Sequence, residues 1–274
     1  MADIDPINLL YQGQYDLFLA LFNENELINQ TYLLAKYYEL NGHFQTALDL
    51  LNKSETSENS TFNFYMEKIF ISYIYWRMRN YSLSIDLLDS IKEKIHKINN
   101  VDLLGEFFNT LGLVNWSLND LNNALSNFNL AYEYRNTNTS QVILSNTLNN
   151  LGNTYLKLNN QKKALKYYNK SYTIRKQLNY SPLLALSYNS FGRLEELKKN
   201  HQKAEMYYKK SLVLWEQVNN TQFIGKSFRF LAINAKFQNQ LSLEKKFWEL
   251  SNQNFEKINN NFDLEYNKSF IANL

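Results

Sequence analysis

The sequence contains no cysteine, only two prolines (Pro6 and Pro182) and only seven glycines in 274 residues. Without cysteine the chain cannot form a disulfide, a thiolate nucleophile or a cysteine-ligated zinc site. Because proline and glycine interrupt helices, their shortage favours a helical fold over a turn-rich β fold. Hydrophobic residues make up 45% of the chain and aromatic residues 15%, which is enough to form a packed core.

Long apolar runs and strong charge are also missing. No run of about eighteen apolar residues occurs, so we expect no membrane-spanning helix. The acidic N-terminus has no basic region of the kind that begins a secretory signal, and we therefore expect a cytoplasmic protein. The formal net charge of +3 is weak for a nucleic-acid binder, which normally carries a basic stripe, and no nucleic-acid partner is expected.

Patterns typical of catalysis are likewise absent. The three histidines, His43, His96 and His201, fall in different parts of the chain, and we predict surface roles for them. There is no glycine-rich phosphate loop and no His-Glu-x-x-His pair. Glu195 and Glu196 are adjacent on a predicted helix, so their carboxylates do not face each other. We therefore expect no enzymatic activity, no cofactor and no metal site.

A forty-residue repeat is the main feature of the sequence. Small residues recur at this interval, and each is followed at fixed distances by an alanine, an aromatic residue and another small residue. The four columns are Gly112, Gly152, Gly192, Ala232; Ala124, Ala164, Ala204, Glu244; Phe128, Tyr168, Tyr208, Trp248; and Ala131, Ser171, Ser211, Ser251. Upstream, Ser72 and Ala35 take the glycine place, followed by Ser84 and Ala47. Such a period predicts stacked supersecondary units.

The spacing within a unit predicts two antiparallel helices, A and B. The small residue of helix A is expected where helix B crosses it, and the alanine of helix B is expected at the same crossing. The aromatic residue is expected to fill the space between adjacent units. One helix pair cannot bury its apolar stripe alone, so several units must stack.

The clearest unit is Thr147-Leu-Asn-Asn-Leu-Gly-Asn-Thr-Tyr155 followed by Lys163-Ala-Leu-Lys-Tyr-Tyr-Asn-Lys-Ser-Tyr-Thr-Ile-Arg175. It resembles the tetratricopeptide repeat (TPR), in the forty-residue form of kinesin light chains, spindle-orientation adaptors and peptide-pheromone receptors. The resemblance implies an all-α, right-handed superhelical solenoid of antiparallel helix pairs. One departure is the absence of the usual proline after helix B, where Asn136, Lys176, Glu216 and Glu256 stand.

We predict a single domain over residues 1–274. It comprises a degenerate first helix pair at 5–28, five to six TPR units over about 29–260, and a capping helix at 261–274. The Asp, Glu and Lys residues of the last segment predict a polar outer face, as the end of a solenoid requires. The polar connectors at 54–61 and 136–140 are too short to separate domains.

The predicted binding face lies on helix A. Residues at offsets −6, −3, +1 and +4 from the glycine column share one helical face, which the resemblance implies lines a concave groove. There asparagine would bond the backbone of an extended peptide, since its amide both donates and accepts, and lysine or arginine would hold carboxylates. The candidate peptide-binding residues are Asn109, Asn146, Asn149, Asn153, Asn189, Arg193, Lys226 and Arg229.

Two other interpretations of these residues stay open. The chain has 41 asparagines, so aligned asparagines can arise from composition alone, and Asn150, expected on another face, is also asparagine. For Trp116, Trp76 and Tyr73 a core role is favoured over a ligand platform, although Tyr32, Tyr73 and Trp76 of the N-terminal units could form an apolar half-groove.

The sequence therefore predicts a non-enzymatic scaffold or adaptor that holds a peptide or an extended protein segment with acidic residues or a free carboxylate. A peptide-signal receptor whose superhelix changes shape on ligand binding is the alternative. An RNA-binding helical repeat is disfavoured by the modest charge.

Overall fold

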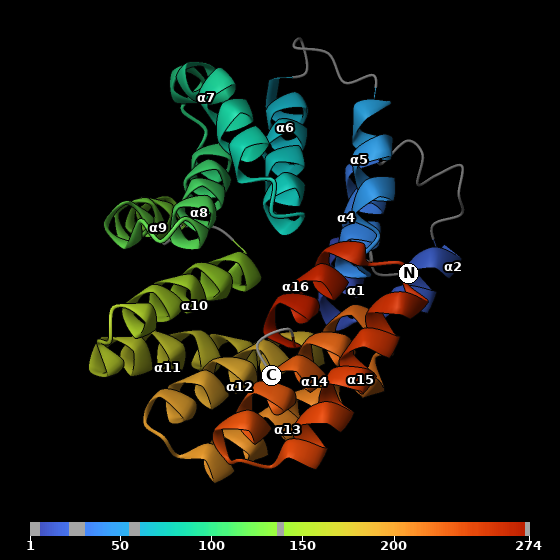
Figure 1. The fold of residues 1–274 in the computed structure, drawn as a ribbon. Coiled ribbons are helices and arrows are strands. Elements are labelled where there is room, and N and C mark those ends of the chain that lie inside the picture. Colours follow the sequence, from blue (N-terminus) through green and yellow to red (C-terminus); the bar gives the residue numbers. More distant parts are fainter. Residues whose placement is uncertain (1–5, 22–30, 55–60, 136–139, 272–274) are drawn as a thin grey trace. The chain divides into compact units, whose positions relative to one another are not determined.

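The computed structural model describes residues 6–21, 31–54, 61–135 and 140–271 (Figure 1), and these residues form helices and short turns with no strand among them. The all-α prediction is confirmed. The helices are α1 (Pro6–Gln12), α2 (Tyr15–Leu21), α4 (Thr31–Leu40), α5 (Phe44–Asn52), α6 (Thr61–Arg77), α7 (Tyr81–Ile98), α8 (Val101–Ser117), α9 (Leu121–Arg135), α10 (Gln141–Lys157), α11 (Gln161–Leu178), α12 (Ser181–Leu197), α13 (His201–Gln217), α14 (Thr221–Phe237), α15 (Leu241–Lys257) and α16 (Asn261–Ile271).

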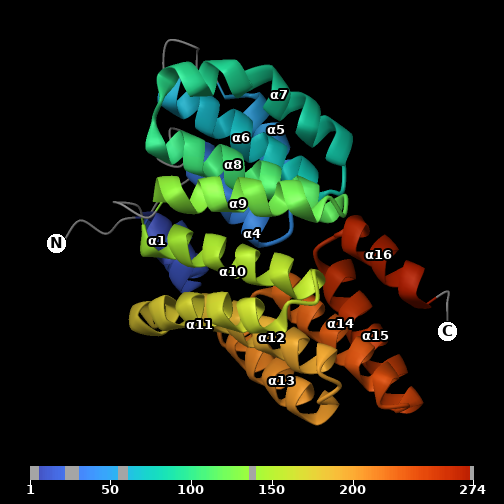
Figure 2. The same cartoon turned by 90° about the vertical axis from the view of Figure 1, so that its left-hand side faces the viewer.

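The helices match the predicted order of A and B helices. Helices α6, α8, α10, α12 and α14 carry the glycine column or its substitutes, and α7, α9, α11, α13 and α15 carry the alanine and aromatic columns. Neighbours such as α8 and α9 pack side by side (Figure 2). The predicted first pair corresponds to α1 and α2, with residues 22–28 outside the described part of the chain. The predicted cap corresponds to α16, with residues 272–274 outside it.

The packing groups the chain into two compact units. Unit 2 is continuous and comprises residues 44–174, whereas unit 1 combines residues 1–43 with residues 175–274. Unit 1 therefore joins the first helices of the chain to its last repeats, which a linear stack of units would keep apart. The single domain predicted for residues 1–274 stays a prediction.

Asparagine has a specific use in the turns between helices. Residues with positive φ recur at intervals of about twenty positions, and most of them are asparagine: Arg79, Asn99, Asn119, Asn159, Asn179, Lys199, Asn219, Asn239 and Asn259. Asparagine tolerates this left-handed conformation better than other residues with a Cβ atom. The next residue often caps the following helix: Asn100 accepts from the Asp102 and Leu103 amides, and Asn220 from the Phe223 amide. Much of the asparagine at helix ends is thus structural, not merely compositional.

The glycine and aromatic columns meet inside each unit. A Cβ atom on Gly112 would lie 2.7 Å from the Phe128 ring, and one on Gly152 would lie 2.5 Å from the Tyr168 ring. Only glycine lets these rings approach the A helix so closely. The aromatic residue therefore packs on the glycine of its own unit. It also contacts the next A helix, as expected for a residue between adjacent units: Phe128 packs with Leu151, and the Tyr208 ring stacks on Phe230 at 5.2 Å between ring centres.

Serine replaces both small residues at the corresponding crossing of α6 and α7. The Ser72 hydroxyl donates to the Ser84 carbonyl at 3.0 Å, and the Ser84 hydroxyl donates to the Ser72 carbonyl at 2.9 Å. Both residues are fully buried. The predicted crossing of helices A and B is therefore confirmed here, with reciprocal hydrogen bonds satisfying the two buried hydroxyls.

Candidate functional site

Three predicted groove residues of unit 2 lie on one stripe of α10. Asn146, Asn149 and Asn153 are each half-buried, as expected for side chains that line an accessible face. Asn109 on α8 differs, because it is only 8% exposed and its Oδ1 accepts a hydrogen bond from Asn150 Nδ2 at 3.0 Å. Asn150 therefore joins this contact, and part of the asparagine column links one A helix to the next.

Similar links recur between successive A helices of unit 2. Trp76 Nε1 donates to the Ser117 hydroxyl at 2.7 Å. Lys157 Nζ donates to the Trp116 carbonyl at 3.1 Å and lies 4.5 Å from the centre of the Trp116 ring. In each case the partners are 41 residues apart. Trp76 and Trp116 thus take part in packing between helices, in line with the core role favoured for them.

Buried tyrosines of the aromatic column reach the predicted groove face through their hydroxyl groups. Tyr168 Oη donates to Asn153 Oδ1 at 2.8 Å, and Tyr208 Oη donates to Glu196 Oε2 at 3.2 Å. Both rings are almost completely buried. The sequence reasoning missed these contacts, and the available signal was the tyrosine hydroxyl in this column where the preceding unit has Phe128.

In unit 1, α12 presents Asn189, Arg193 and Glu196 at intervals that place them on one helical stripe. Asn189 is 8% exposed, and its Oδ1 has no hydrogen-bond partner among the described residues. Glu196 Oε1 is also buried and lacks such a partner. Burial raises the pKa of Glu196, although the Tyr208 hydroxyl and the positive charge of Arg193 act to lower it.

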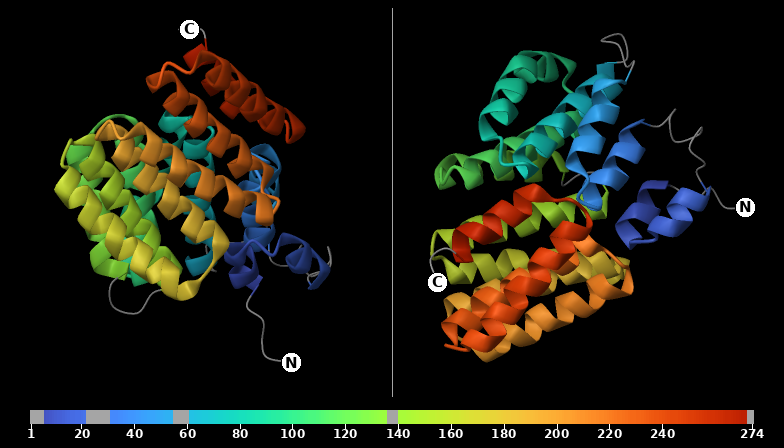
Figure 3. Two further views of the ribbon diagram at one scale, coloured as in Figure 1. Left: turned by 90° about the horizontal axis from the view of Figure 1, so that it is seen from below. Right: turned by 45° about the vertical axis from the view of Figure 1, so that its right-hand side comes forward.

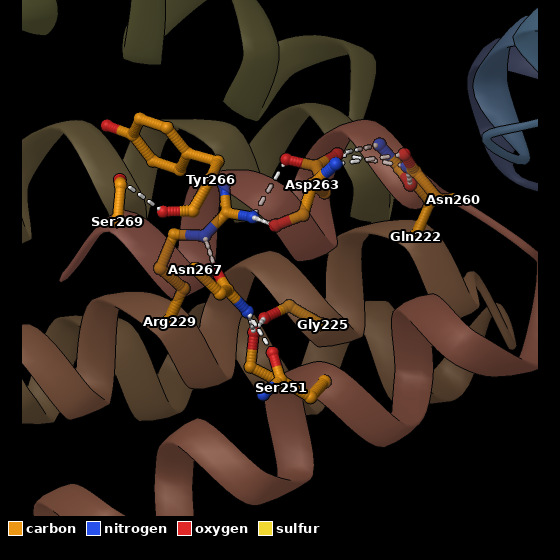
Figure 4. Close-up of polar contacts among 10 residues, drawn as sticks. Gln222, Gly225, Arg229, Ser251, Asn260, Asp263, Tyr266, Asn267 and Ser269 are labelled. Atoms are coloured by element: carbon orange, nitrogen blue, oxygen red, sulfur yellow. Dashed lines mark hydrogen bonds and ion pairs between the residues drawn. The ribbon is translucent and has the colours of Figure 1, made fainter. Parts of the chain in front are cut away.

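The two predicted cationic residues of α14 have different environments. Lys226 is half-buried, with its Nζ 5.0 Å from the centre of the Phe223 ring. Arg229 is only 7% exposed, and its guanidinium faces α16 of its own chain (Figure 4). It donates from Nε to Asn267 Oδ1 at 2.6 Å and from Nη2 to Asp263 Oδ1 at 2.8 Å. Arg229 is therefore engaged within the protein, unlike the open groove residue expected.

Around this ion pair the polar side chains form a continuous buried network (Figure 4). Asp263 Oδ2 accepts from Gln222 Nε2 at 3.1 Å and from Asn260 Nδ2 at 3.0 Å. Asn267 Nδ2 donates to the Ser251 hydroxyl at 2.9 Å. Since these groups are mutually satisfied, α16 docks through polar contacts as well as apolar ones.

The outer face of α16 is only partly as predicted. Glu265 and Lys268 are exposed, in agreement with a polar cap, and they pair at 2.6 Å. Asp263, however, points inward and is 6% exposed. Figure 3 shows α16 beside α15 at this end of unit 1, where it continues the alternation of helices.

Two buried arginines were missed by the sequence reasoning. In unit 2, Arg135 is 2% exposed and donates to the Thr147 hydroxyl, and it pairs with Glu106 at 2.8 Å. In unit 1, Arg175 is 1% exposed and donates to the Ser187 hydroxyl at 3.1 Å, and burial lowers its pKa to about 9. In both cases the arginine precedes its hydroxyl partner by twelve residues. This repeated spacing of an arginine and a hydroxyl residue is the sequence feature from which the two buried contacts could have been predicted.

The histidines occupy separate positions, with His43 in the turn before α5, His96 in the last turn of α7 and His201 at the start of α13. Across the described ranges, no group of three or more histidine, aspartate or glutamate side chains could hold a metal ion. None of the helices in those ranges is long and apolar enough to cross a membrane.

Comparison with known families identifies the repeats. Residues 104–177 and 143–217 match the tetratricopeptide repeat family. Residues 104–217 thus carry tetratricopeptide repeats. The two matched TPR segments overlap and extend from α8 to α13, so they include most of the predicted groove residues. No curated protein matches the sequence.

Solved structures of TPR-type proteins resemble the fold. A Rap protein complexed with competence and sporulation factor is 12% identical, with 93% of this chain and 76% of that chain covered and a TM-score of 0.70. Aspartyl phosphate phosphatase F from Bacillus subtilis is 11% identical, with 92% and 73% covered and a TM-score of 0.58.

A STAND protein with a tetratricopeptide repeat sensor from Pyrococcus horikoshii is 16% identical, with 93% of this chain covered and a TM-score of 0.59. This chain spans only 42% of that protein's length. At such identities the likeness to these three structures shows the fold alone.

Proposed function

We propose that the protein is a non-enzymatic scaffold that holds an extended peptide segment along the predicted groove face of its A helices. The observation that carries this proposal is the stripe of half-buried asparagines on α10, Asn146, Asn149 and Asn153, within a TPR fold. Neither the crossing of the helices nor the glycine and aromatic columns requires asparagine at these places. A Rap protein of similar fold was solved in complex with competence and sporulation factor, which supports ligand binding as a use of this fold.

The chemistry of the stripe suits an extended backbone. Such a backbone exposes N–H and C=O groups, and an asparagine amide can pair with either. The Tyr168 hydroxyl orients the Asn153 amide by donating to its Oδ1. Arg193 and Lys226 belong to unit 1, where they offer cationic groups to an acidic side chain or a free carboxylate of a peptide on the A helices of that unit. Arg229 is excluded from direct ligand contact in this proposal, since Asp263 and Asn267 already hold its guanidinium.

A test is capture of peptides by the immobilised full chain from an equimolar pool of synthetic hexapeptides, followed by mass spectrometry. Asn146→Ala combined with Asn149→Ala should reduce the captured amount at least about tenfold, because two amide contacts of roughly 1 kcal/mol each are lost. The matched control is Asn122→Ala with Asn169→Ala, two exposed asparagines on B helices, which should capture as the wild type does. Undiminished capture by the α10 variant, with unchanged melting, would reject the groove assignment.

The receptor alternative makes a different prediction in the same system. If binding changes the shape of the protein, the captured peptides should alter its radius of gyration in small-angle X-ray scattering. A scaffold whose A helices are already linked, as by Asn150 and Asn109, should bind with an unchanged radius.

A further inference from the structure

Two buried acceptors on α12 lack partners. Asn189 Oδ1 and Glu196 Oε1 are both inaccessible to solvent, and neither has a hydrogen bond among the residues that the structure describes. Leaving a buried acceptor without a hydrogen bond is unfavourable, and native proteins satisfy the great majority of such groups. Unlike the unpartnered oxygens of Glu244, which stands in the alanine column of the helix crossings, these two lie on the predicted groove face, where a bound ligand would supply the donor.

The two acceptors belong to one stretch of the predicted groove face. Seven residues separate Asn189 from Glu196, so they lie on the same side of α12, roughly 10 Å apart along the helix axis. Glu196 is half-buried, and the Tyr208 hydroxyl donates to its other oxygen, Oε2, at 3.2 Å. The carboxylate is thus held in place by a side chain from the core of α13.

The TPR fold does not require a carboxylate at this position. The residue one unit earlier is Leu156, and two units earlier it is Trp116. Asparagine, in contrast, recurs at the other position, as Asn109, Asn149 and Asn189. Of these three units, only this one has a carboxylate at the position. Such variation between units is expected of a residue that determines which ligand side chain binds.

The chemistry of Glu196 indicates that the group donating to its Oε1 carries a positive charge. A carboxylate forms its strongest hydrogen bonds with ammonium or guanidinium groups. Burial raises the pKa of Glu196, so a cation at Oε1 would offset the cost of burying its negative charge. Arg193, one turn earlier, contributes positive charge near Glu196 but leaves Oε1 without a hydrogen bond.

We propose that Glu196 forms a subsite for the ammonium or guanidinium group of a lysine or arginine side chain in the bound peptide, and that Asn189, two helical turns earlier, accepts from a backbone amide of the same peptide. This inference rests on the proposed function, because it assigns the chemistry of one position in the same groove. The ligand then carries a basic residue at this subsite, in addition to any acidic group held by Lys226.

The test uses the immobilised full chain and hexapeptide pools that are acetylated at the N-terminus and amidated at the C-terminus. One position is varied among lysine, arginine, glutamate and norleucine, so that side-chain charge is the only ionic difference between peptides. The wild type should capture lysine or arginine peptides about tenfold over norleucine peptides, the lower end of the range for a hydrogen bond to a charged group. Glu196→Gln, which retains an acceptor for Tyr208, should abolish this preference, whereas Asn189→Ala should lower the capture of all peptides and leave the preference unchanged.

Glu216→Gln is the matched control, because Glu216 is exposed on α13 and its removal changes the net charge equally. It should retain the preference for basic peptides. Persistence of that preference in Glu196→Gln, or no preference of the wild type for lysine or arginine peptides over norleucine peptides, would overturn the inference while leaving peptide binding established. Failure to capture any peptide would reject the proposed function itself, and this inference with it.

Discussion

The Asn220 side chain donates to the Tyr15 hydroxyl at 3.0 Å across a sequence separation of 205 residues. The same amide donates to the Leu40 carbonyl at 3.2 Å, while Asn220 Oδ1 accepts from the Phe223 amide. Asn220 is fully buried, so its side chain both caps α14 and holds the N-terminal helices. Within unit 1 the first helices thus depend on a turn of the last repeats.

This contact makes stability sensitive to alkaline pH. Burial raises the pKa of Tyr15 from 10.0 to about 12, although the hydrogen bond from Asn220 acts to lower it. Below pH 10 the Tyr15 phenol is neutral in both the folded and the unfolded state, so its contact contributes fully to the free energy of unfolding. Between pH 10 and 12 only the unfolded state loses the proton, so stability falls by about 3 kcal/mol.

Tyr15→Phe should therefore have a free energy of unfolding that declines less steeply between pH 10 and 12 than that of the wild type. Urea denaturation at a series of pH values measures this difference. Between pH 7 and 9 the two proteins should differ by a constant amount, which is the internal control. Equal slopes above pH 10 would show that Tyr15 is not buried in this way.

The ion pair between Arg229 and Asp263 should be sensitive to the loss of either partner. Both side chains are about 8% exposed, so Asp263→Ala leaves a buried guanidinium without its counterion. Removing one member of a buried pair costs about 3–5 kcal/mol. Glu265→Ala on the same helix removes an exposed carboxylate and should cost less than about 0.5 kcal/mol. Chemical denaturation compares the two, and equal effects would contradict the role of the network in docking α16.

The turn after α12 offers a stabilising substitution. Lys199 has a φ of 62°, whereas asparagine occupies most of the equivalent turns. Since a side chain such as lysine is strained in this conformation, Lys199→Asn or Lys199→Gly should raise stability by about 0.5–1 kcal/mol. Lys176→Asn, an exposed change within α11, should instead lower it by a few tenths of a kcal/mol. Thermal denaturation distinguishes the two, and a loss of stability in Lys199→Asn would refute the conformational argument.

Glu244 is a second candidate for stabilisation. It stands where Ala124, Ala164 and Ala204 occur in the preceding units, it is 2% exposed, and neither carboxylate oxygen has a partner in the described structure. Glu244→Ala should therefore stabilise the protein by about 1–3 kcal/mol. The exposed Glu249→Ala on the same helix should change stability little. A lower melting temperature for Glu244→Ala would indicate that the buried carboxylate is satisfied in solution.

Much of the fold could be read from the sequence because it depends on short-range geometry. The forty-residue spacing of Gly112, Gly152 and Gly192 located the A helices, and the aromatic residues sixteen positions later located their partners. These columns reflect helix periodicity and close backbone approach, which any sequence of this fold must satisfy locally. The candidate site was harder to predict from the sequence, because its residues were selected only by the helical face on which they lie.

The sequence by itself determined the repeat, the helix order and the stripe of asparagines on α10, since each follows from the spacing of residues along the chain and within one helix. The tertiary structure decided which of the predicted groove residues are already engaged. Of these, Arg229 is held by Asp263 and Asn109 by Asn150, 34 and 41 residues away. Outside the predicted groove, Tyr15 is held by Asn220 across 205 residues. The position of a side chain along its helix defines the direction in which it points, but the residues that it contacts depend on how distant segments of the chain pack together.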